Sequence, residues 1–242
     1  MSKMDGKLQN ASPSREVERY WLESRRPLES LAFIAPLLIV YEAGVLWLGA
    51  QNGADAFMRW VLQMLGFGQH FVLPVLMICV LLAWHHVARQ YWRLSGSVLS
   101  RMAAESVCLG LCLCVFCLVW NSSPSASVGE TMRQGVGPLL ALLGAGIYEE
   151  LLFRLILLSL SVWALRRMGM TPRAGMLVAV IANGLLFAAA HHMGPYGEHP
   201  LLINRFLFRA LAGAFFSAIF IYRGFGIAAG SHAAYDVLVS VL

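Results

Sequence analysis

Seven long apolar segments dominate this sequence and restrict the kind of fold it can adopt. An α-helix needs about 20 apolar residues to cross roughly 30 Å of hydrocarbon. The segments lie at 29–50, 70–88, 98–120, 137–163, 174–192, 202–222 and 225–242. Of the 242 residues, 59% are hydrophobic and 13% are charged, unlike a soluble domain. We therefore predict an all-α fold: a polytopic transmembrane helix bundle.

One further segment leaves the number of spans open. The stretch DAFMRWVLQMLGFG at 55–68 is either an interfacial helix or part of an eighth element, re-entrant or spanning. The sequence thus predicts about seven to eight spans within one transmembrane helical domain, 29–242.

The first 28 residues form a polar and basic segment, too long and too charged for an ordinary cleavable signal sequence. Ser12 and Pro13 suit the N-cap and first position of a helix, and Pro27 ends the charged run SREVERYWLESRR. We expect a short amphipathic helix on the cytoplasmic surface in segment 1–28, with no soluble domain.

The connections between the apolar segments are alternately rich and poor in Lys and Arg, and this alternation predicts how the chain is oriented in the membrane. Starting before the first span, the connections hold six, one, three, one, three, one and one Lys or Arg. Cytoplasmic loops are the ones enriched in these residues, so the N-terminus should be cytoplasmic. We expect a bacterial inner membrane protein whose net charge of +5 reflects orientation. Nucleic acid is not an expected partner, because no binding motif for it is present.

We predict that the five cysteines serve as small apolar side chains in helix packing. Cys79 lies in the second apolar segment and the other four lie within CLGLCLCVFC at 108–117. Their spacing could bring pairs onto one helix face and so hold a soft metal, but cysteine also packs as a small hydrophobe. We favour packing, and we expect no disulfide framework.

Ionisable groups within the apolar segments are the strongest functional signal. The stretch GAGIYEELLFRLILL at 144–158 carries Glu149, Glu150 and Arg154. An acidic residue at bilayer depth costs at least ~2.5–3.5 kcal/mol, so such residues usually serve a function. Glu150 and Arg154 are four residues apart on one helix face, whereas Glu149 points elsewhere. We predict that Arg154 neutralises and orients Glu150, and that Glu149 faces the bundle interior.

Two later segments carry possible partners for Glu149. NGLLFAAAHHMGP ends an apolar helix at His191 and His192, and His232 and Asp236 share a face of the last helix. Asn183 lies two turns before His191 and is a weaker candidate for lining the same cavity. Each histidine alone could be an interfacial or cross-linking residue. Three apolar segments that each carry acid or imidazole groups instead favour a shared site.

The chemistry open to such a site is hydrolysis, with or without a metal. A carboxylate beside an imidazole can deprotonate water for attack on a carbonyl, and further donors can stabilise the oxyanion. A zinc site would use both imidazoles and a carboxylate, with water as the fourth ligand. The sequence lacks the His-Glu-x-x-His pattern of the usual zinc proteases. We expect no cofactor, with zinc as the alternative.

The order of these motifs resembles that of a known family, the CAAX-processing and bacteriocin-processing (CPBP or Abi) intramembrane endopeptidases of the glutamate type. The likeness covers about 138–236 and includes FLFRALAGAFFSAIFIYRGFGIAAGSHAAYD, with Phe206 and Gly213 where the family packs an aromatic and a small residue. The motifs that carry it are Glu149-Glu150-x-x-x-Arg154, Phe187-x-x-x-His191 and His232-x-x-x-Asp236.

The resemblance implies specific roles. Glu149 and His191 would activate water, Glu150 and Arg154 would hold the geometry, and His232 with residue 236 would stabilise the oxyanion. Phe187 of the second motif would support the site, and we expect the same of Asn183 as a residue that lines the cavity. Family members cleave near the C-terminus of membrane-anchored or lipidated proteins, and bacterial members are linked with protein maturation and bacteriocin immunity. A membrane-anchored protein or lipidated peptide in the bilayer is thus the expected partner.

Two features do not fit this picture directly. Residue 236 is often Asn in the family, and an ionised Asp236 would repel an oxyanion. Asp236 is therefore either protonated or serves only to orient His232. The predicted boundaries also put Glu149, His191 and His232 at different depths, although catalysis needs them around one water. We attribute this mismatch to a boundary, a tilt or the span count.

Two other functions are compatible with the same residues. The chain could be a non-catalytic scaffold or a bacteriocin-immunity-type binding protein whose polar groups form interhelical hydrogen bonds. It could also be a solute or proton carrier, although its hydropathy has no inverted repeat. A scaffold would tolerate Glu149→Gln, and an endopeptidase would not.

Overall fold

A computed structural model describes residues 13–120, 136–193 and 202–241 of the chain. The first twelve residues and Arg133 lie outside the described ranges. The described parts are all-α, as the sequence predicts. Four of the helices are long and apolar enough to cross a membrane: α2 (Pro27–Leu48), α5 (Gly96–Val119), α9 (Pro172–Ala190) and α10 (Ile203–Arg223). These helices mark the chain as an integral membrane protein.

The other helices fall on the remaining apolar segments. They are α3 (Gly53–Met64), α4 (Val72–Val87), α7 (Val136–Glu150), η2 (Leu151–Leu158), α8 (Ser159–Arg167) and α11 (Phe225–Val241). Helix α7 continues without a break through η2 into α8, which extends the predicted segment 137–163 to Arg167. Helix α3 has 12 residues, and Asn52 caps its first turn by accepting a hydrogen bond from the Asp55 amide.

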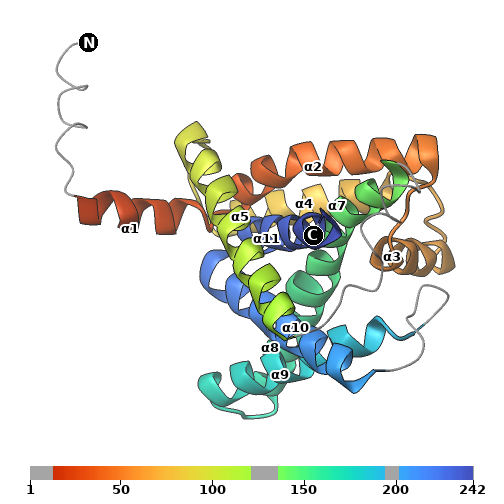
Figure 1. Cartoon of the computed structure of the whole chain (residues 1–242). Coiled ribbons are helices and arrows are strands. Elements are labelled where there is room, and N and C mark those ends of the chain that lie inside the picture. Colours follow the sequence, from red (N-terminus) through yellow and green to blue (C-terminus); the bar gives the residue numbers. More distant parts are fainter. Residues whose placement is uncertain (1–12, 121–135, 194–201, 242) are drawn as a thin grey trace.

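The short amphipathic helix predicted near the N-terminus is present as α1 (Pro13–Glu23). It extends sideways from the bundle (Figure 1), and its last turns contact α5 and α10. The Tyr20 hydroxyl donates to Glu105, and Arg223 lies 3.9 Å from the centre of the Trp21 ring. Burial and the hydrogen bond to Glu105 raise the pKa of Tyr20 above its usual range. These contacts hold α1 to one end of the bundle.

Helix α11 lies among α2, α5, α7 and α10, and small residues bring it close to its neighbours (Figure 1). A Cβ built on Gly146 of α7 would lie 2.7 Å from the Cβ of Ala233. A Cβ built on Gly110 of α5 would lie 2.9 Å from the Tyr235 amide nitrogen. These approaches bring the His232 turn of α11 against the end of α7.

The turn after α7 is a π-helix, η2, whose wider winding leaves backbone carbonyls free for side-chain donors. The Asn183 amide of α9 donates to the Phe153 carbonyl at 2.7 Å, and the Ser159 hydroxyl donates to the Arg154 carbonyl at 3.3 Å. π-Helical turns are frequent at functional sites. Here η2 begins directly after Glu150 and contains Arg154.

Candidate active site

The ion pair predicted between Glu150 and Arg154 is present at the junction of α7 and η2. Arg154 Nη1 lies 2.8 Å from Glu150 Oε1, and both side chains are fully buried. A charge removed from water in this way is stable only when it is paired. The pair therefore explains how two charged side chains persist in this apolar segment.

Arg154 also connects the pair to α9 and α10. Its Nη2 donates to the Gly213 carbonyl at 3.1 Å, and its guanidinium lies 4.5 Å from the centre of the Phe187 ring. Gly213 permits this close packing, because a Cβ there would lie 2.9 Å from the Cα of Gly184. The Arg154 side chain is thereby fixed by a carboxylate, a carbonyl and an aromatic face.

His232 lies against the other side of the same carboxylate. Its Nδ1 is 2.7 Å from Glu150 Oε1, and its ring stacks on Phe216 at 4.4 Å between ring centres. Because the carboxylate accepts, Nδ1 carries the proton, and Nε2 points into the site. Arg154, Glu150 and His232 therefore form a chain that fixes the position of one imidazole.

Glu149 lies between the two imidazoles. Its Oε2 is 3.8 Å from His191 Nε2 and 3.8 Å from His232 Nε2, distances longer than a direct hydrogen bond. His191 Nδ1 lies 2.8 Å from the Phe187 carbonyl, which can only accept. The Nε2 lone pair of neutral His191 therefore faces Glu149.

The predicted mismatch in depth is absent. His191 caps the C-terminus of α9, His232 lies near the middle of α11, and Glu149 is the next-to-last residue of α7, yet all three side chains meet. The prediction had treated the spans as straight and parallel, so that a residue's position in its span gave its depth. The small-residue contacts of α7 with α11 and of α9 with α10 set the relative heights of these helices instead.

Asp236 is the fourth residue of the cluster. Its Oδ2 lies 3.6 Å from His232 Nε2, the nitrogen that also faces Glu149. His232 thus has Glu150 on one ring nitrogen and both Asp236 and Glu149 near the other. This geometry is compatible with a carboxylate that orients the ring.

A comparison with protein families matches residues 134–238 to the model described as type II CAAX prenyl endopeptidase Rce1-like. That segment is a domain of this family. All of the candidate site residues lie within it. Searches of curated proteins and of solved structures found no match to the chain.

Within the Rce1-like domain, Phe187 and Asn183, two of the predicted support residues, differ in their contacts. Phe187 touches the site directly, with its ring centre 4.6 Å from that of His191 and 5.9 Å from that of His232. Asn183 is buried one turn away, where it donates to the Phe153 carbonyl and accepts from the Ser217 hydroxyl at 3.3 Å. Asn183 therefore ties α9 to η2 and α10, and its hydrogen bonds within the described parts of the chain go to Phe153 and Ser217, not to Glu149 or the imidazoles.

Sequence reasoning missed Phe216. This residue of α10 is buried, and its ring stacks on that of His232 in α11. A signal was available, since Phe216 lies three residues after Gly213 and so on nearly the same helix face. Phe206, two turns before Gly213, has its ring centre 6.0 Å from that of His192. Within the described ranges, no three His, Cys, Asp or Glu side chains are arranged to hold a metal ion.

A second buried polar cluster lies outside the Rce1-like domain except for Tyr148. Arg59 of α3 donates from Nη2 to both carboxylate oxygens of Glu42 of α2, at 3.0 and 3.1 Å, and its Nε lies 2.5 Å from Asp55 Oδ1. Tyr41 donates to Asp55 at 2.7 Å, and Tyr148 of α7 donates to Glu42. We call these five residues the α2–α3–α7 network; it fixes the helix that carries Glu149.

Proposed function

We propose that the chain is an intramembrane endopeptidase that hydrolyses a peptide bond near the C-terminus of a membrane-anchored protein. One observation carries the proposal: the Glu149 carboxylate lies 3.8 Å from an imidazole nitrogen on each of two other helices. A water within hydrogen-bond reach of Glu149 and His191 would be oriented and deprotonated by groups already in place. The match of 134–238 to the endopeptidase family supports the same reading.

The reaction needs no covalent intermediate. Glu149 takes a proton from water, with His191 Nε2 accepting a hydrogen bond from the same water. The resulting oxygen attacks the peptide carbonyl, so that a C–O bond forms and the carbonyl becomes an oxyanion. Collapse breaks the C–N bond, and Glu149 returns its proton to the leaving amine.

His232 would stabilise the oxyanion when both of its ring nitrogens carry protons. Its Nδ1–H is held by Glu150 at 2.7 Å, which leaves Nε2–H free to donate to the substrate. Asp236 would orient that group by accepting a hydrogen bond in the absence of substrate, since its Oδ2 lies 3.6 Å from Nε2. Glu150 and Arg154 act only through His232 and are positioning residues.

The membrane arrangement proposed with this activity is a bundle of seven to eight spans over 29–242. The N-terminus and α1 would be cytoplasmic, and the membrane would be the inner membrane of a bacterium. The helices that follow the predicted apolar segments support this arrangement. The clustering of Lys and Arg in alternate connections supports the orientation.

The experiment is a comparison of membrane-protein C-termini by mass spectrometry in the native host. Cells lacking the protein receive the wild type or Glu149→Gln at matched expression. We expect one or a few membrane proteins to keep an unprocessed C-terminal segment only with Glu149→Gln. Identical C-termini in the two strains would refute proteolysis and favour the scaffold or immunity role.

A further inference from the structure

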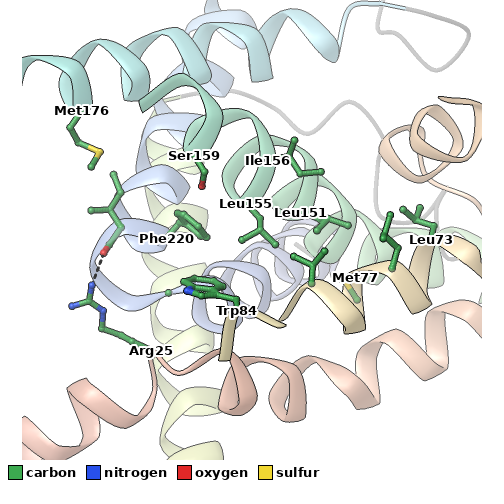
Figure 2. Close-up of a pocket in the computed structure, with 14 residues that line it drawn as sticks. Arg25, Leu73, Met77, Trp84, Leu151, Leu155, Ile156, Ser159, Met176 and Phe220 are labelled. Atoms are coloured by element: carbon green, nitrogen blue, oxygen red, sulfur yellow. Dashed lines mark hydrogen bonds between the residues drawn. The ribbon is translucent and has the colours of Figure 1, made fainter. Parts of the chain in front are cut away.

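A large cavity lies apart from the catalytic residues, between α4 and the η2–α8 segment, and is shown in Figure 2. Its volume is about 690 Å³, within the range of small-molecule sites. Its lining includes residues near the ends of α4, α9 and α10, namely Trp84, Met176 and Ile221, and Gly224, which follows α10. The side chains of Glu150 and Arg154 do not line it.

The wall of this cavity is apolar along its length. Leu76 and Met77 of α4, Leu151 and Leu155 of η2 and Phe220 of α10 all line it, and Phe220 lies beside Leu155 (Figure 2). Ser159 also lines the cavity, but its hydroxyl donates to the Arg154 carbonyl of its own helix. A peptide here would leave its backbone N–H and C=O groups unpaired, at a cost of several kcal/mol each. A hydrocarbon chain has no such groups.

Arg25 is the one charged side chain among the described residues that line the cavity, and it lies at one end of it (Figure 2). It is exposed, and its Nη2 donates to the Ile221 carbonyl at 3.2 Å. No ion pair between Arg25 and a carboxylate is found among the described residues, whereas neighbouring Arg26 lies 4.0 Å from Glu23. A guanidinium beside an apolar slot complements a ligand with an anionic head and an apolar tail.

We propose that this cavity binds one acyl chain of an anionic phospholipid and that Arg25 holds the phosphate of its headgroup. Trp84 lies at the same end of the cavity, as expected for an aromatic side chain at headgroup level. The lipid would contact η2 on the side away from the ion pair and fix α4 against it. The proposal does not depend on the chain being an endopeptidase.

The test is native mass spectrometry of the full-length protein released from nanodiscs of equal phosphatidylglycerol and phosphatidylcholine. The wild type should keep one phosphatidylglycerol in preference to phosphatidylcholine. Arg25→Gln should lower that preference about fivefold, the effect of one basic residue near the headgroups. Arg15→Gln removes the same charge from exposed α1 and should leave the preference unchanged.

A second variant tests the acyl-chain part of the site. Leu155→Trp should fill the cavity and abolish retention of phosphatidylglycerol and of phosphatidylcholine alike, whether or not Arg25 is present. Equal retention of the two lipids by the wild type would overturn the proposal, as would an equal loss with Arg15→Gln and Arg25→Gln. Release of the wild type without any bound lipid would overturn it as well.

Discussion

The candidate active site and the α2–α3–α7 network are both buried clusters of charged residues, and they differ in how fully their polar atoms are paired. In the α2–α3–α7 network, every buried polar side-chain atom of Glu42, Asp55 and Arg59 has a hydrogen-bond partner. In the candidate active site, Glu149 Oε2, Glu150 Oε2 and Arg154 Nε have no hydrogen-bond partner among the described protein atoms. Buried polar groups are normally satisfied, and exceptions need a reason.

The difference separates a structural role from a chemical one. In a fully paired network every buried polar atom already has a protein partner, so the network stabilises helix positions. A cluster with unused acceptors can still bind a substrate or water, at a cost in stability, and perturbed groups of this kind gather at functional sites. The α2–α3–α7 network should therefore respond to mutation mainly in stability, and the candidate site mainly in rate.

His191→Ala should give the largest effect, a fall in processing rate of about 10²–10⁴-fold, because it removes a partner of the attacking water. The melting temperature should stay near that of the wild type, since the hydrogen bond that His191 loses among the described residues is one to the Phe187 carbonyl. Processing is followed on the substrate found by C-terminal mass spectrometry. His192→Ala, the adjacent imidazole, is the control and should keep its activity.

Arg59→Met and Arg154→Met compare the two clusters directly. Each removes the cation of a buried pair and strands carboxylates, at a cost of about 3–5 kcal/mol in unfolding free energy. Only Arg154→Met should also lower the rate per folded molecule, because His232 loses its positioning chain. Denaturant unfolding and the rate of the folded fraction measure the two effects. A similar rate loss in both variants would contradict the division between the clusters.

Tyr148→Phe should have a smaller effect, although Tyr148 is the neighbour of Glu149 in the sequence. The change removes the hydrogen bond to Glu42 and should cost about 1–3 kcal/mol of stability, as expected for a bond to a charged group. The processing rate of the folded protein should be unchanged. A rate that falls more than stability would mean that the α2–α3–α7 network takes part in catalysis.

Asp236→Asn should give the smallest effect. An amide can still accept a hydrogen bond from His232 Nε2, which lies 3.6 Å from the present carboxylate oxygen. We expect less than a tenfold change in rate and about 0.5 kcal/mol or less in unfolding free energy. Asp236→Leu, of similar size but unable to accept, is the comparison and should lower the rate further. Equal rates in Asn and Leu variants would rule out the orienting role.

Much of this arrangement could be predicted from local spacing. The apolar segments contain helices, and the Glu150–Arg154 pair is confirmed because residues four apart on a helix must lie on one face. The contact of His232 with Glu150 could not be predicted in this way. It depends on how closely α11 approaches α7 at Gly146, a tertiary contact that hydropathy does not report.

The α2–α3–α7 network was missed although its signal was present. Glu42 is an acidic residue within the first apolar segment, and the same argument from burial cost that selected Glu149 applies to it. The prediction used Arg59 only as a basic residue in a connection between spans, because the sequence does not show that α3 folds back against α2. The π-helical turn η2 also has no signature in the sequence, since its residues are ordinary helix formers.

The central claim is that Glu149 serves chemistry and not helix packing. The most direct measurement pairs the processing rate with the thermal unfolding of wild type and Glu149→Gln in proteoliposomes. The account predicts a rate at least about 10²-fold lower with an unchanged unfolding temperature, because glutamine keeps the shape but cannot accept the proton. Full activity in Glu149→Gln, or a rate that falls only in step with stability, would contradict it.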